Sequence, residues 1–282
     1  MIFDIRSKST MKKLRALNSR WLQILAGGAL LFIGSEQALK FTGNPNFVPT
    51  VILLGALVIP ATFVAFFYER ERKLESSYIE SPLVLVLICF IAGGAIGVVS
   101  AGFIEYETLT SLTIPGLFGV GLIEESAKLI LPVIIYIRNK YLSEIDGLLF
   151  GVSSGMGFAA LETMGYGFVA LLQSNGSIGT LEEVLLMRGL LSPIGHAAWT
   201  GLVCASLWHE RQRTHKMFNP RVIGIFVLAI FLHAVWDIAG SVQQIYIVLA
   251  GFVIIGTVSM VLLIRKLREA ARIKTADTSL VV

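Results

Sequence analysis

Charged side chains are scarce in this sequence. Asp, Glu, Lys and Arg make up 15% of its 282 residues, whereas soluble globular proteins average about 25%. Cysteine is scarcer still, and the two that occur, Cys89 and Cys204, lie inside apolar runs far apart in the chain. This spacing excludes a disulfide framework and a cysteine-based zinc knuckle, so we expect two small buried side chains. The HExxH motif and the Walker A phosphate loop are also absent.

Long apolar runs take the place of the missing charge. Hydrophobic residues account for 55% of the chain, the mean hydropathy is +0.77, and runs such as 47–67 and 82–103 hold almost no charge. About 20 apolar residues with a rise of roughly 1.5 Å each match the ~30 Å hydrocarbon layer of a bilayer. We therefore predict an all-α fold, a polytopic transmembrane helical bundle, and exclude a soluble enzyme or a disordered chain.

About eight spans can be drawn along the chain. We expect them at 21–41, 47–68, 82–103, 112–137, 146–172, 182–208, 220–240 and 242–264. This layout places 20 of the 23 Lys and Arg residues on one side of the membrane. By the positive-inside rule both termini then face the cytoplasm of a multi-pass cell-membrane protein. The basic residues lie in short loops and form no continuous face, so we expect no nucleic-acid partner.

The same layout predicts the domain organisation. Residues 1–20 form a basic cytoplasmic tail, 21–111 hold the first three spans, 112–241 hold spans four to seven, 242–264 form the last span and 265–282 form a second tail. Glu105 and Glu107 fall in an outer loop and are expected to be hydrated. Pro193 and Gly195 are expected to kink the sixth span.

Several ionisable residues lie far from either end of their spans. They are Glu124, Glu125, Lys128, Glu162, His196, His233 and Asp237. Each intramembrane charge costs about 2.5–3.5 kcal/mol on insertion scales, so such residues need partners and indicate function. Counted from the cytoplasmic ends, four of the spans place one such residue about 18–24 Å deep. We therefore predict that acids and imidazoles from these spans meet in one layer.

The charges in this layer do not balance. Four acids face one lysine, and Lys128 can neutralise only Glu124 or Glu125, at i,i+4 or i,i+3. Either some carboxylates stay protonated, or a divalent cation binds there with histidine nitrogen ligands. Two histidines and a carboxylate are a usual catalytic zinc set, and a further carboxylate can act as the general base. Gly151, Gly155, Gly157, Gly165 and Gly167 are expected to let other helices approach Glu162 closely.

Four short motifs in the span-four to span-seven region resemble one family. EESAK at 124–128 fits an EExxK pattern, FAALE at 158–162 fits FxxxE, HAAWTG begins at His196, and HAVWD at 233–237 fits HxxxD. Their order and their placement on successive spans resemble the PrsW family of intramembrane proteases, which is similar to the CAAX-processing and bacteriocin-processing membrane proteases. The resemblance covers roughly residues 112–241.

The resemblance implies a metal-dependent membrane peptidase, and the best known member of the family cleaves a membrane-anchored anti-sigma factor. It also implies residue roles. Glu124 and Glu125 would activate water or hold the metal, Lys128 would fix this pair, and Asp237 would orient a histidine or stabilise the tetrahedral intermediate. Glu162, His196 and His233 would be the remaining ligands of a divalent metal, for which zinc is the expected ion. The related prenyl-protein proteases carry His where this chain has Glu162.

The expected partners are the lipid bilayer and a substrate that is a membrane protein or a membrane-tethered peptide. Two alternatives stay open at this point. A proton- or cation-coupled transporter also places carboxylates and histidines at mid-depth, and a non-catalytic homologue would bind membrane proteins without cutting them.

Overall fold

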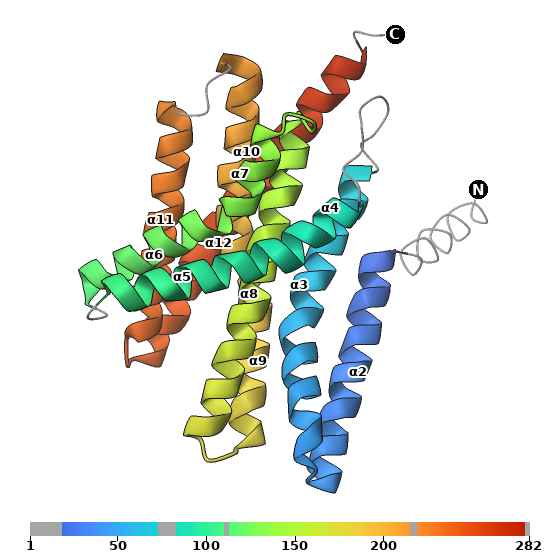
Figure 1. The fold of residues 1–282 in the computed structure, drawn as a ribbon, viewed down its shortest axis with the longest axis vertical. Coiled ribbons are helices and arrows are strands. Elements are labelled where there is room, and N and C mark those ends of the chain that lie inside the picture. Colours follow the sequence, from blue (N-terminus) through green and yellow to red (C-terminus); the bar gives the residue numbers. More distant parts are fainter. Residues whose placement is uncertain (1–18, 73–82, 110–112, 215–218, 280–282) are drawn as a thin grey trace, which may run out of the picture. The chain divides into compact units, whose positions relative to one another are not determined.

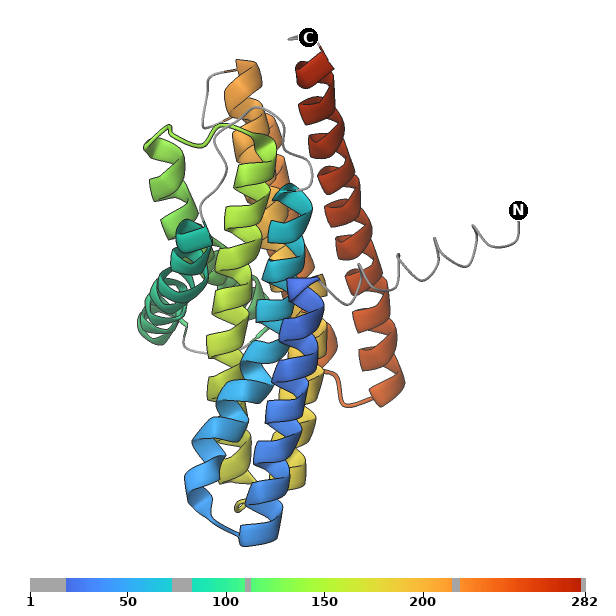
Figure 2. The same ribbon diagram turned by 90° about the vertical axis from the view of Figure 1, so that its right-hand side faces the viewer.

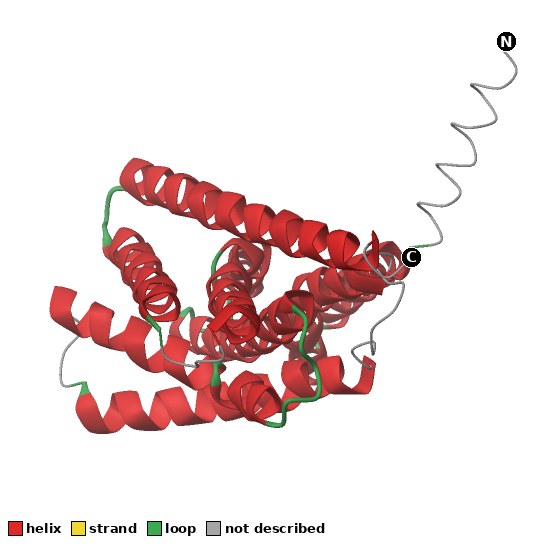
Figure 3. Ribbon diagram, turned by 90° about the horizontal axis from the view of Figure 1, so that it is seen from above, coloured by secondary structure: helices red, strands yellow, loops and turns green. Residues whose placement is uncertain are grey.

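The computed structural model describes residues 19–72, 83–109, 113–214 and 219–279. Over these residues every regular element is a helix and no strand occurs (Figure 3). The predicted all-α fold is therefore confirmed. The elements are α2 (Arg20–Thr42), η1 (Pro45–Phe47), α3 (Val48–Arg72), α4 (Leu83–Ile88), η2 (Cys89–Gly93), α5 (Gly94–Thr108), α6 (Ile114–Lys128), α7 (Ile130–Ile137), α8 (Glu144–Gln173), α9 (Ile178–Leu191), η3 (Ser192–Ile194), α10 (His196–Thr214), α11 (Pro220–Ser241) and α12 (Ile245–Ser279).

Seven helical segments in the described residues are long and apolar enough to cross a membrane. They correspond to seven of the eight expected spans. The remaining expected span is the fourth, at 112–137. It consists of two shorter helices instead of one, because α6 ends at Lys128 and α7 begins at Ile130. The span Ile178–Thr214 is interrupted by η3 and Gly195, as the positions of Pro193 and Gly195 predicted. Helix α12 continues past the predicted end of the last span to Ser279 (Figure 2).

The chain forms two compact units, and helix α8 contributes to both. The first unit contains Met1–Lys73 and Thr163–Leu190. Its helices α2 and α3 form a hairpin, with Gly43 as the C-cap of α2 in the left-handed region at a φ of 63°. Leu181 and Leu185 of α9 are buried in the same apolar cluster as Val51 and Ala56 of α3. This unit holds none of the predicted site residues.

The second unit contains Leu74–Glu162 and Leu191–Val282. Its centre is α10, whose residues from Ala197 to Trp208 are all buried. Helix α10 packs against α11 and α12, and α6 packs against α11 and α5. Cys89 and Cys204 are both buried with free thiols in one apolar cluster, as expected.

Helices α5 and α6 of the second unit lie side by side and run across the direction of α10 and α11 (Figure 1). The π-helical turn η2 precedes α5, and glycines then allow close contact with α8. A Cβ on Gly94 would lie 2.4 Å from the Gly157 carbonyl carbon, and a Cβ on Gly157 would lie 1.8 Å from the Phe90 carbonyl oxygen. Beyond these glycines, Ala101 of α5 packs with Ala127 and Phe158. This crossing decides which part of α5 reaches the site.

Candidate active site

Helix α6 ends within the EESAK motif, and the reason is local. Pro132 has no N–H group, so it cannot donate the usual hydrogen bond to the carbonyl of Lys128 four residues earlier. The Ser154 hydroxyl of α8 donates to this carbonyl instead, at 2.7 Å. The last turn of α6 is thereby anchored to α8 at the level of the lysine. Pro132 thus favours the end of α6 near Lys128, and the contact with Ser154 fixes the position of Glu124, Glu125 and Lys128.

Lys128 lies at the centre of the site, with none of its side chain exposed. Its Nζ lies 3.1 Å from Glu124 Oε2, 2.8 Å from Glu125 Oε1 and 2.9 Å from His196 Nδ1. An ammonium group has three protons to donate, and these three acceptors use all of them. The Phe158 ring lies 4.3 Å from Nζ and closes another side of the ammonium group. The lysine therefore links α6 to the first residue of α10.

Glu125 is the buried partner in this network, with 1% of its side chain exposed. Its Oε1 accepts from Lys128 and lies 2.9 Å from His233 Nδ1, while Oε2 accepts from the Thr200 hydroxyl at 3.3 Å. A carboxylate can only accept, so His233 Nδ1 is the donor, and Nε2 is the basic nitrogen of the neutral ring. Glu125 therefore supports the site and fixes the tautomer of His233.

His233 directs Nε2 toward two other acids. This atom lies 3.5 Å from Glu124 Oε2 and 3.4 Å from Asp237 Oδ2, one helical turn further along α11. The ring stacks on Trp199 at a centroid distance of 4.8 Å, and the Trp199 indole donates to the Ser259 hydroxyl. The orientation of the imidazole is therefore fixed by both hydrogen bonding and packing.

His196 is the first residue of α10, directly after the break at η3. Because the Lys128 ammonium can only donate, His196 Nδ1 accepts, and Nε2 lies 3.4 Å from Glu162 Oε2. Gly155 of α8 allows this placement, since a Cβ there would lie 2.5 Å from the His196 carbonyl oxygen. A divalent ion binds an imidazole nitrogen that carries no proton, so metal binding at Nε2 would require this proton to leave the ring or move to Nδ1.

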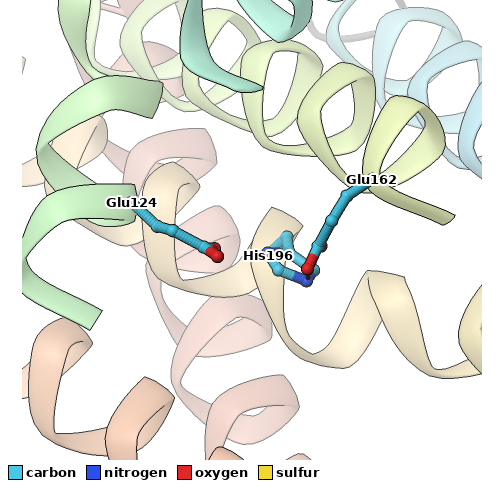
Figure 4. Close-up of side chains that lie close together, drawn as sticks. All are labelled: Glu124, Glu162 and His196. Carbon is cyan, nitrogen blue, oxygen red and sulfur yellow. Dashed lines mark ion pairs between the residues drawn. The ribbon is translucent and has the colours of Figure 1, made fainter. Parts of the chain in front are cut away.

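Three side chains converge closely enough to share an ion. One ligand atom from each of Glu124, Glu162 and His196 lies within 4.8 Å of the other two. Figure 4 shows the Glu124 carboxylate directed toward the Glu162 and His196 pair from the opposite side. His233 Nε2 adjoins this group through its 3.5 Å contact with Glu124. Two imidazoles and two carboxylates are a donor set that suits zinc and similar divalent ions.

The structure thus brings all seven predicted residues into one network in the second unit. The prediction that glycines let other helices approach Glu162 closely holds in part. Gly151 and Gly155 face α10 and Gly157 faces Phe90, but nothing lies within 4 Å of a Cβ placed on Gly165. Gly151–Gly155 also has the G-x-S-x-G spacing of serine hydrolases. Here it runs through the middle of α8, and the Ser153 hydroxyl donates to the Leu149 carbonyl.

Glu105 is a functional candidate that the sequence reasoning missed. It was expected in a hydrated outer loop, and this is wrong, because α5 continues to Thr108 and crosses toward the site. Its Oε1 is buried, and the residue interacts electrostatically with Glu124 and Glu162. A signal was available, since Gly97, Ala101 and Glu105 recur every four residues on one helix face. Glu107 was expected in the same loop and also lies on α5, where it is exposed.

Comparisons with known proteins show which family the chain resembles. The family model described as "PrsW family intramembrane metalloprotease" matches residues 81–264. Protease PrsW of Oceanobacillus iheyensis is 25% identical over 193 residues, covering 66% of this chain and 81% of the relative. Protease PrsW of Clostridioides difficile is 23% identical over 195 residues, covering 65% and 77%. Protease PrsW of Geobacillus kaustophilus is 26% identical over 192 residues, covering 66% and 78%. No solved structure matches the chain.

The family match covers well over half of the chain and includes every site residue described above. It confirms the resemblance seen in the four motifs, together with the predicted multi-pass membrane protein and its peptidase activity. It favours an enzyme over the transporter and over the non-catalytic homologue, and the family description implies a metal. The chain therefore belongs to the PrsW family of intramembrane metalloproteases.

Proposed function

We propose that this protein hydrolyses a peptide bond of a membrane-anchored protein or a membrane-tethered peptide, with zinc as the bound metal. The observation that carries the proposal is the convergence of Glu124, Glu162 and His196 within 4.8 Å. Helices α8, α10 and α11 of this site belong to segments apolar enough to cross a membrane. A substrate that reaches the site therefore has to lie in the bilayer or be tethered to it.

Glu162, His196 and His233 are the proposed metal ligands. Two of these ligands already have a suitable spacing, because His196 Nε2 lies 3.4 Å from Glu162 Oε2, close to the roughly 3.3 Å between two ligands about 2.0 Å from a tetrahedral ion. His233 Nε2 adjoins them through its 3.5 Å contact with Glu124. A carboxylate that accepts from the far nitrogen of a histidine, as Glu125 does for His233, is the usual support of a metal-binding imidazole. A bound divalent ion would supply a Lewis acid that activates water and polarises the scissile carbonyl.

Glu124 is the proposed general base. Its carboxylate lies within reach of Glu162 and His196 and faces the space that they share. It takes one proton from the attacking water while the water oxygen forms the new bond to the carbonyl carbon. It then passes that proton to the amide nitrogen as the C–N bond breaks. One water is consumed, and a carboxyl and an amino terminus are produced.

The remaining residues hold this arrangement. Lys128 offsets the charge of Glu124 and Glu125 and hydrogen-bonds His196. Asp237 is more exposed than the other acids in contact with the histidines, at 27% of its side chain, and it approaches His233 Nε2. We propose that Asp237 orients this imidazole from the open side of the site.

Measuring metal content and cleavage together tests these roles. Purified protein in detergent is assayed for bound zinc and for cleavage of a membrane-tethered peptide library, with Glu107→Gln on the exposed end of α5 as the matched control. Glu124→Gln is expected to keep zinc and lose cleavage. Glu162→Gln and His196→Ala are expected to lose both. The control is expected to retain both.

Three results would change the proposal. Zinc loss in Glu124→Gln would move Glu124 from the general base to the metal ligands. Undiminished cleavage in both Glu124→Gln and His196→Ala would rule out this cluster as the active site. Cleavage by wild-type protein that resists strong chelators would argue against a metal-activated water.

A further inference from the structure

Among the described residues, Glu105 is the acid near the site that the proposed mechanism does not use. Its position follows from the register of α5. Gly97, Ala101 and Glu105 share one face of the helix, because residues four apart lie one turn above another. A Cβ on Gly97 would lie 2.9 Å from the Phe158 ring, and Ala101 packs on Phe158 and Ala127. The next turn of this face carries Glu105 toward the group formed by α6 and α8.

The carboxylate of Glu105 reaches the site without bonding to it. Its Oε1 is buried and has no hydrogen-bond partner among the described residues. It interacts electrostatically with charged site residues, repulsively with Glu124 and Glu162 and attractively with Lys128. A buried carboxylate oxygen without a donor is costly, since it has lost water and gained nothing in exchange. The missing donor is therefore expected to arrive with another molecule.

Charge indicates what that donor is. Glu105 joins four other acids, Glu124, Glu125, Glu162 and Asp237, whereas Lys128 is the one cation of the described site. Neutral imidazoles add no positive charge, and a divalent ion adds two. A negative excess therefore remains after the proposed metal has bound. A net negative charge in a region of low dielectric attracts a cation and repels an acid.

We propose that Glu105 is a specificity residue, which receives a basic side chain of the substrate, Lys or Arg, next to the scissile bond. The inference rests on the proposed peptidase mechanism and adds a substrate class to it. The partial exposure of Glu105 suits this role, because a receiving carboxylate has to be reachable from outside the metal group. The long apolar stem of a lysine or arginine can lie along the membrane helices while its charged end reaches the carboxylate.

Paired substrates test the proposal. The probes are membrane-tethered peptides that are identical except for Lys, Gln or Glu at each position flanking the cleaved bond. The wild-type protein is expected to cleave the best Lys peptide with a kcat/KM about tenfold above that of its Gln counterpart. Glu105→Gln is expected to bring this ratio close to one, mainly through KM. Glu105→Lys is expected to favour the Glu peptide. Each value is the ratio of kcat/KM for two peptides measured on the same variant. A variant that contains less active protein therefore gives an unchanged ratio.

Glu107→Gln and Glu107→Lys are the matched controls, two residues further along α5 on its exposed side. They are expected to keep the wild-type ratio. A wild-type ratio near one, or a ratio that survives in Glu105→Gln, would overturn the proposal. Loss of zinc in Glu105→Gln would overturn it too, because Glu105 would then act at the metal.

Binding separates this inference from the proposed function. The same peptides are bound to protein carrying Glu124→Gln, with and without Glu105→Gln, and the dissociation constants are compared. A preference for the Lys peptide that depends on Glu105 supports the inference even if no peptide is cut. Equal binding of the Lys and Gln peptides by the Glu124→Gln protein would count against it. Absence of cleavage by the wild-type protein would count against the peptidase mechanism alone.

Discussion

Lys128 Nζ lies 2.9 Å from His196 Nδ1, and this contact joins the end of α6 to the start of α10. The same ammonium group forms ion pairs with both Glu124 and Glu125 and offsets one of their two charges. The lysine therefore performs two tasks in one place, since it stabilises a buried acid pair and sets the position of a proposed metal ligand.

Replacing this lysine is expected to destabilise the fold. Lys128→Met leaves two buried carboxylates without their cation, and breaking a buried ion pair from one side costs about 3–5 kcal/mol. Thermal unfolding in detergent is expected to show a large fall in Tm, with loss of zinc. The double variant Lys128→Met/Glu125→Gln removes one of the unpaired charges and is expected to recover part of the lost stability. A single variant as stable as the wild type would contradict this account of Lys128.

Changing Glu125 to Gln tests its role as the support of His233. The amide keeps the shape of the side chain but weakens the acceptor for His233 Nδ1, which lies 2.9 Å from Oε1. Loss of such a supporting carboxylate typically costs 10–100-fold in metal affinity or activity. We expect a decrease of about that size in kcat/KM, measured on folded protein. Thr200→Val removes the weaker 3.3 Å contact to the same carboxylate and is the comparison. An equal or larger loss in Thr200→Val would count against the assignment.

Adding one methyl group to Gly155 is expected to displace His196. A Cβ at this position would lie 2.5 Å from the His196 carbonyl oxygen, so α8 and α10 have to separate. Overpacking of this kind costs about 1–3 kcal/mol, and the shift moves a proposed ligand. Gly165→Ala, in the same helix, has open space around the new methyl group. We expect zinc binding and cleavage to fall in Gly155→Ala and to persist in Gly165→Ala, and identical behaviour of the two would be inconsistent with the close approach.

The site was largely predictable from the sequence, because ionisable side chains inside membrane-spanning segments cost free energy. Glu162 and His233 fall inside apolar runs, so hydropathy alone marks them as residues in need of partners. Their meeting was predicted by counting depth along straight spans, and the structure brings both residues into one network with Glu124. The fold class followed from the same runs.

What could not be predicted depends on contacts between distant segments. The loop assignment failed for Glu105, because α5 continues to Thr108 and crosses the other helices of its unit after the π-helical turn η2. No local pattern sets the angle of a helix, which here depends on where Gly94 meets Gly157. The different roles proposed for Glu124 and Glu125 could not be predicted either, because two adjacent identical residues differ only in the contacts that their helix faces make.

The hydroxyl of Ser154 satisfies the carbonyl left free at the break between α6 and α7, and two neighbouring serines allow a matched test. Ser154 donates to the Lys128 carbonyl, which Pro132 cannot serve. Ser153 is equally buried, but it donates to the Leu149 carbonyl within its own helix, where a backbone N–H is also available. Ser154→Ala is expected to lower the free energy of unfolding by about 1–3 kcal/mol, the cost of a buried acceptor left without a donor. Ser153→Ala is expected to change it by a smaller amount. Denaturant titration in detergent measures both. If Ser153→Ala were the more damaging of the two, the Lys128 carbonyl would not need its donor from α8.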